Sequence, residues 1–150
     1  MADDFMSGQS TARKAAEILV AKNAGFRVPT AKQRQNLVVA FAKRGMVVYG
    51  KAFDIVRLNA EVDLDDLADI EQGFDRFTIF EIKSTRKPLK PNFAGYFFAL
   101  TAAELLVAQS LKKNFKFVLV NITTGDFLEL TLMEIFAKAR GIYPTWSISF

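Results

Sequence analysis

The sequence contains no cysteine and no histidine. Without cysteine there is no disulfide framework, and so nothing indicates an oxidising compartment. Zinc sites nearly always use Cys or His ligands, and Ser-His-Asp and Cys-His catalysis need an imidazole, so these chemistries are excluded. The chemistry that remains relies on carboxylates, lysine, hydroxyl groups, tyrosine and hard metal ions bound through oxygen.

Long apolar runs are missing as well. The longest apolar stretch, Phe93 to Ala103, is far shorter than the roughly 20 residues needed to cross a bilayer. The chain begins with acidic and polar residues, without the basic start and apolar run of a signal peptide. We therefore expect a cytoplasmic protein with no membrane partner.

The chain has 150 residues, about one domain's worth, and 51% of them are hydrophobic, enough for one sizeable core. Charge is unevenly distributed: residues 1–45 have eight Lys/Arg against three Asp/Glu, whereas residues 46–80 have three against eight. Basic segments around an acidic centre are typical of nucleic-acid-binding proteins that hold a metal ion. The same distribution is typical of the solvated faces of ordinary helices.

Apolar residues recur at helical spacing in several segments. We expect helices at residues 11–22, 30–45, 101–111 and 131–140, with a shorter helix or ordered loop at 61–72. Thr30 is a suitable N-cap for the second helix. The pairs Thr101/Glu104 and Thr131/Glu134 have the spacing of capping boxes and mark the starts of the last two.

Strand patterns, either rich in Val, Ile and Phe or alternating at period two, occur at residues 46–58, 74–83, 115–122 and 127–130. Gly50 would turn the first of these into a hairpin, and Trp146, Ile148 and Phe150 have the spacing of an edge strand. Four phenylalanines are expected to lie in the core: Phe97, Phe98, Phe115 and Phe117. Helices packed on a central mixed β-sheet predict an α/β (α+β) fold in a single domain, residues 1–150, with a helical N-terminal segment at 1–45.

The strand pattern at residues 74–83 runs into the sequence FEIKST, residues 80–85. Alternation puts Glu81 and Lys83 on the same face of a strand that is otherwise apolar. Charged side chains in such a position are rare unless they are paired or bind a metal ion. A second apolar segment, residues 52–56, carries one carboxylate, Asp54.

Two carboxylates on adjacent strands would form a site for Mg²⁺, which takes oxygen ligands in octahedral geometry, and the backbone carbonyl of Ile82 could serve as a further ligand. A metal ion there polarises a phosphoryl oxygen and lowers the pKa of a bound water. Lys83 could orient or deprotonate the nucleophile or stabilise the added negative charge. Basic side chains that could hold DNA phosphates follow directly: Arg86, Lys87 and Lys90.

A strand with Asp54, then a strand ending in Glu81-Ile82-Lys83 and Ser/Thr, then a helix and a strong apolar strand, resembles the PD-(D/E)xK nuclease superfamily, which is restriction endonuclease-like. The resemblance covers roughly residues 46–122, so that residues 46–130 would be the catalytic core. It implies that Asp54 and Glu81 bind Mg²⁺, for which Mn²⁺ can substitute, and that Lys83 assists attack by water. Phe53 stands where the family often has proline, and residues 60–73 would be an insertion.

Three further residues are candidates for this site. Asp75 is an alternative first carboxylate, but in an extended strand it would lie about 20 Å from Glu81, too far to share a metal ion. Glu17, on the first helix, is a candidate metal ligand because many relatives supply an acidic residue from such a helix. It could equally be a solvated helix residue. Gln109 could face the catalytic sheet, as in some relatives.

The predicted function is Mg²⁺-dependent hydrolysis of DNA phosphodiester bonds by an endonuclease of restriction type or related to defence or repair. A structure-specific nuclease similar to Holliday junction resolvases is one alternative. A catalytically silent nucleic-acid-binding or subunit module on the same fold is another. Because one active site cuts one strand, a homodimer or a partner subunit would supply the second site.

Overall fold

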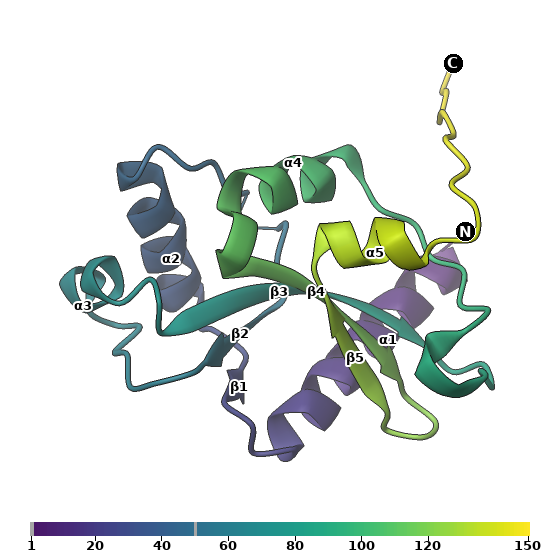
Figure 1. The fold of residues 1–150 in the computed structure, drawn as a ribbon, viewed down its shortest axis with the longest axis horizontal. Coiled ribbons are helices and arrows are strands. Elements are labelled where there is room, and N and C mark those ends of the chain that lie inside the picture. The colour runs from purple at the N-terminus through teal and green to yellow at the C-terminus, as the bar shows by residue number, and fades with distance from the viewer. Residues whose placement is uncertain (1, 50) are drawn as a thin grey trace.

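The computed structural model of the protein describes residues 2–49 and 51–150. Within these residues the centre is a five-stranded sheet whose strand order follows the chain, β1-β2-β3-β4-β5 (Figure 1). The strands are β1 (Phe26–Arg27), β2 (Ile55–Leu58), β3 (Phe77–Thr85), β4 (Phe115–Asn121) and β5 (Phe127–Leu130). β3 and β4 run parallel, and the other three neighbouring pairs are antiparallel. The sheet is therefore mixed, as predicted, and its two longest strands lie side by side.

Helices cover both faces of the sheet, with α1 across one face and α4 and α5 over the other (Figure 1). Alternation along β3 sends Phe77 and Ile79 into the larger core, under α2 to α5, and Phe80 and Ile82 into a smaller core under α1. The helices are α1 (Ala2–Ala21), α2 (Ala31–Lys43), α3 (Leu67–Gln72), α4 (Ala102–Leu111) and α5 (Leu132–Lys138), with short 3₁₀ turns at Pro91–Phe93 (η1) and Lys112–Asn114 (η2). None of the helices described is long and apolar enough to cross a membrane.

Three of the helices begin at the threonines predicted to cap them. Thr30, Thr101 and Thr131 each accept a hydrogen bond from the backbone N–H three residues on, and the Gln or Glu there bonds back to the cap. These reciprocal bonds satisfy backbone donors that a helix N-terminus otherwise leaves free. The starts of α2, α4 and α5 are therefore confirmed as local features of the sequence.

The strand predicted at residues 46–58 is wrong for most of its length, since β2 begins only at Ile55. Val48, Ala52 and Phe53 are buried against the larger core, so their apolar side chains are accommodated without pairing in the sheet. Gly50, the predicted turn, lies outside the described residues. The N-terminal segment is also not purely helical, because Phe26–Arg27 forms β1 and pairs with β2.

Two further predictions fail near the C-terminus and before α4. Residues 141–150 form no strand, and Trp146, at 88% exposed, is typical of them. Residues 141–150 pair with no strand of the sheet and all are exposed, so the alternating spacing there has no buried face. Phe115 and Phe117 are buried as predicted, but Phe97 is 78% exposed.

Candidate functional site

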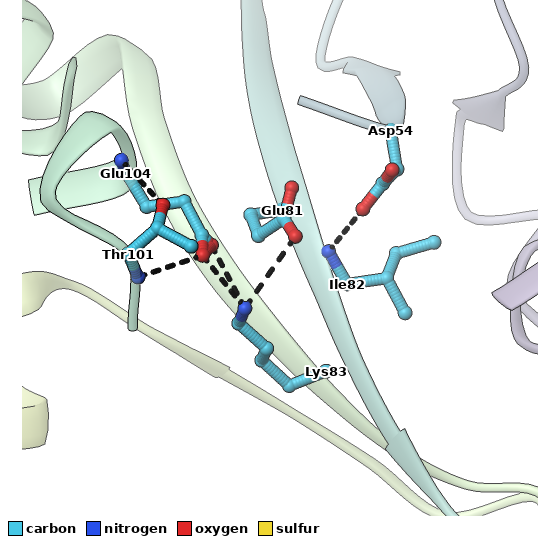
Figure 2. A network of polar contacts seen from close by, with 6 residues as sticks. All are labelled: Asp54, Glu81, Ile82, Lys83, Thr101 and Glu104. Carbon is cyan, nitrogen blue, oxygen red and sulfur yellow. Dashed lines mark hydrogen bonds and ion pairs between the residues drawn. The ribbon is translucent and has the colours of Figure 1, made fainter. Parts of the chain in front are cut away.

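Asp54 stands directly before β2 and extends the pairing of β2 with β3 by one step. Its backbone N–H donates to the carbonyl of Phe80 at 2.8 Å. Its side-chain Oδ2 accepts a hydrogen bond from the backbone N–H of Ile82, also at 2.8 Å. The Asp54 carboxylate therefore takes the place of a strand carbonyl as the hydrogen-bond acceptor for Ile82 of β3. It lies beside Glu81 (Figure 2).

Glu81 lies between Asp54 and Lys83 on β3 (Figure 2). Its carboxyl is largely buried beside that of Asp54, with which it shares a hydrogen bond when it is protonated, whereas the ionised Oε2 has no donor among the described residues. Burial raises the pKa of Glu81 to about 9, and the negative charges of Asp54 and Glu104 add to the effect, while Lys83 opposes it. Without a further cation, these surroundings favour the protonated form of this carboxyl.

Lys83 is held by a residue on another element, Glu104 of α4. The Lys83 Nζ lies 2.8 Å from both carboxylate oxygens of Glu104 and 3.6 Å from Oε1 of Glu81 (Figure 2). Glu104 is only 4% exposed, and its Oε1 also accepts a hydrogen bond from the backbone N–H of Thr101. The sequence pattern identified Glu104 as part of a capping box, and the structure adds a second role, holding the lysine of the site.

Arg34, on α2, contacts the backbone of the segment that carries Asp54. Its guanidinium donates to the backbone carbonyls of Phe53 and Asp54 and lies 4.5 Å above the centre of the Phe53 ring. Burial lowers the pKa of Arg34, and the nearby charges of Asp54 and Glu81 partly offset this. Nothing in the sequence pattern singled out Arg34, because its role depends on contacts 19 and 20 residues away along the chain.

A groove of about 690 Å³ runs between α1 and the edge of the sheet that carries Asp54. Asp54, Ile82, Arg13 and Glu17 all contribute to its walls. In the part of the chain that the structure describes, no group of three Asp or Glu side chains is arranged to hold a metal ion. Glu17 thus lies in the same groove as Asp54 but does not complete a three-carboxylate cluster with Asp54 and Glu81.

The remaining sequence candidates lie away from the two carboxylates. Asp75 is exposed in the turn before β3, at the opposite end of that strand from Lys83, so the structure brings Asp54 rather than Asp75 next to Glu81. Gln109 is exposed on α4 and does not face the sheet as it would in some relatives.

The basic loop, which we define as Arg86, Lys87 and Lys90, follows β3 and exposes all three side chains. Its backbone is held by the last residue of β4 and by the turn that follows. Thr123 Oγ1 donates to the carbonyl of Arg86 at 2.8 Å, and Asn121 Nδ2 donates to that of Lys87 at 3.1 Å. The loop therefore presents its charges from a fixed backbone next to the strand that carries Lys83.

The donor set fits a hard divalent cation. Within a strand, the N–H and C=O of one residue point to the same edge. Because the N–H of Ile82 points to Asp54, the Ile82 carbonyl lies on that edge too. Asp54, Glu81 and this carbonyl are oxygen donors, and Mg²⁺ is commonly bound through one or two carboxylates while it keeps several waters. When Glu81 is ionised, its buried Oε2 has no donor among the described residues, and such a cation would satisfy it.

Compared with protein-family models, with curated proteins and with solved structures, the chain matches none of them. The arrangement of the side chains therefore carries the functional interpretation.

Proposed function

We propose that this chain is a Mg²⁺-dependent endonuclease that hydrolyses DNA phosphodiester bonds on a restriction endonuclease-like fold of the PD-(D/E)xK type. The observation that carries the proposal is the convergence of Asp54, Glu81 and Lys83, with a buried oxygen of Glu81 that has no hydrogen-bond donor among the described residues once this carboxyl is ionised. A largely buried carboxyl with a raised pKa, next to a second carboxylate and a lysine, destabilises the metal-free fold, and such groups cluster at functional sites. Mn²⁺ should substitute for Mg²⁺ because both accept oxygen ligands.

In the proposed mechanism the protein groups have separate tasks. Asp54, Glu81 and the Ile82 carbonyl would hold the metal ion, which supplies Lewis-acid polarisation of the phosphoryl group and a more acidic water. Lys83 stabilises the negative charge that develops on the phosphoryl oxygens or orients the attacking water. Glu104 fixes the Lys83 ammonium in place through two contacts of 2.8 Å. The exposed basic loop would hold the DNA backbone beside the cut.

The direct test is cleavage of supercoiled plasmid, a four-way junction and single-stranded DNA in Mg²⁺, Mn²⁺ or EDTA. We expect cleavage with either metal and none in EDTA. Asp54→Asn and Glu81→Gln should each abolish cleavage without unfolding the protein, whereas Asp75→Asn is the matched control and should retain it. Cleavage by Asp54→Asn at the wild-type rate would remove this residue from the site.

One contact favours the catalytically silent module as a second candidate. Both oxygens of Glu104 bind the Lys83 ammonium, so in the metal-free protein its charge is already neutralised. A silent module would cut no substrate in either metal, although a separate binding titration would still show that it binds DNA. Preference for the four-way junction over plasmid would instead favour a junction-resolving enzyme. A homodimer or a partner subunit that completes the second active site belongs to this proposal too, and the mass of the protein in solution tests it.

A further inference from the structure

A second pocket opens at the end of β3, beside the proposed cleavage site. Its volume is about 310 Å³, near the roughly 300 Å³ lower end of ligand pockets. Its walls come from two segments, residues 84–89 directly after Lys83 and residues 95–98 before α4. A pocket of this size accommodates one small group rather than an extended ligand.

Aromatic rings form one wall of this pocket. The ring centres of Tyr96 and Phe98 lie 5.1 Å apart, and the ring centre of Phe93 lies 6.2 Å from that of Tyr96. Phe97 differs from them because it is 78% exposed, with its ring 6.5 Å from that of the exposed Tyr143. The inner rings are thus packed into the fold, whereas Phe97 offers an aromatic face to a ligand.

Polar groups line the pocket as well. Ser84 and Thr85 contribute hydroxyl-bearing side chains, and Lys87 of the basic loop contributes an exposed ammonium. Burial raises the pKa of Tyr96 to about 12, so its phenol stays neutral at any working pH. Aromatic faces combined with a cation are the features by which proteins bind unpaired nucleotides, since the base stacks and the phosphate pairs with the cation.

This pocket begins directly after Lys83, the proposed catalytic lysine, on β3. Thr85 lies two residues beyond Lys83 on the same face of the strand, a distance of about 7 Å. A nucleic-acid strand with one phosphate at Lys83 therefore brings a neighbouring nucleotide to the pocket. Within a duplex, however, that base is stacked and paired, and it reaches a pocket only when it is flipped out at a cost in free energy.

We infer that this pocket binds the base of an unpaired nucleotide next to the scissile phosphate, with Phe97 as the stacking surface. The inference rests on the proposed function for the identity of its ligand. It narrows the substrate class from DNA in general to DNA that is single-stranded or locally unpaired at the cut.

The test uses a short single-stranded oligonucleotide that carries one 2-aminopurine, whose fluorescence falls when the base stacks. The same oligonucleotide annealed into a perfect duplex is the reference, and both are titrated in EDTA so that no strand is cut. Phe97→Ala should weaken single-strand binding roughly 5- to 150-fold, the range for loss of one stacked base, and should abolish the quenching. Phe97→Trp should restore both. Phe136→Ala, which removes a half-exposed phenylalanine of α5, is the matched control and should behave as wild type.

Wild-type affinity and quenching in Phe97→Ala would overturn the inference, even if the protein proves to be a nuclease. An equal loss of affinity for single strand and duplex would overturn it as well. Phe97 would then contact both forms of DNA without needing an unpaired base. Conversely, binding to the single strand that depends on Phe97, together with no cleavage of any DNA in Mg²⁺ or Mn²⁺, would support the pocket and refute the proposed nuclease activity.

Discussion

Replacing Glu81 with glutamine should stabilise the metal-free protein, and the gain should grow as the pH rises. Burial and two neighbouring carboxylates raise the pKa of Glu81 from 4.5 to about 9. The folded protein therefore binds more protons at this position than the unfolded chain does between these two values. The free energy of unfolding falls as the pH rises through that window, because folding then forces a charge into an unfavourable site. Glutamine has the same shape and no charge to bury.

The size of the effect follows from the shift. Each pH unit within the window lowers the free energy of unfolding by about 1.4 kcal/mol. Between pH 5 and pH 8 the wild type should therefore lose at most about 4 kcal/mol relative to Glu81→Gln. This is a large part of the roughly 5–15 kcal/mol that stabilises a typical domain.

Urea unfolding in EDTA at several pH values measures this difference, with Glu61→Gln, at an exposed position, as the matched control. We expect the wild-type and Glu61→Gln curves to fall together and the Glu81→Gln curve to stay higher as the pH rises. A difference between wild type and Glu81→Gln that does not change with pH would refute the electrostatic reasoning. Repeating the titration in Mg²⁺ tests the metal site separately, since the ion should stabilise the wild type at pH 8 but not Glu81→Gln.

Four further outcomes are expected. Lys83→Ala should slow plasmid cleavage by roughly 10²–10³ while DNA binding is retained, and an unchanged rate would remove the lysine from the mechanism. Glu104→Gln keeps the shape of the side chain but not its charge, so it should lower kcat more than it raises KM, and equal changes would contradict a role in positioning Lys83. Neutralising the basic loop should reduce the slope of log affinity against log salt by roughly 0.9 for each phosphate that the loop no longer neutralises, and a fluorescence titration with an unchanged slope would refute a role of the loop in holding phosphates. Gly25→Ala should cost about 1–3 kcal/mol in urea unfolding, because Gly25 has φ +90° and a Cβ there would meet the Leu58 carbonyl. Gly45→Ala, at φ +76° with open space around it, isolates the backbone strain, and equal destabilisation of the two variants would show that the close approach adds nothing.

The parts of the fold that the sequence predicts are those set by neighbours along the chain. The capping boxes at Thr101 and Thr131 need residues three positions apart, and the helices begin there. The alternation of β3 depends only on residues two positions apart, and the two faces of this strand pack into separate cores. Glu81 and Lys83 could be found as a pair for the same reason. Asp54 could be placed beside them because it is the one carboxylate in an apolar segment that pairs with β3.

The contacts that complete the site join distant parts of the chain and leave no periodic signal. Glu104 reaches Lys83 across 21 residues, and Arg34 reaches the carbonyl of Asp54 across 20. Phe97 is predicted to lie in the core but is exposed. A phenylalanine in an apolar stretch predicts burial, but whether the ring turns inward depends on how the irregular segment 94–100 packs on the rest of the fold, and here Phe98 and not Phe97 packs against the core.

The charges around β3 explain why these distant residues belong to one site. Asp54, Glu81 and Glu104 supply three negative charges, and Arg34 and Lys83 supply two positive ones within a partly buried region. The excess negative charge is removed when Glu81 keeps its proton, which is the direction of its pKa shift. Under the proposed function, a divalent cation would reverse this, since Glu81 would ionise beside it and the site would carry one net positive charge. That charge is equal and opposite to the single negative charge of a phosphodiester. Asp54 and Glu81, whose charges destabilise the metal-free site, would therefore hold a metal ion whose charge favours binding of the substrate.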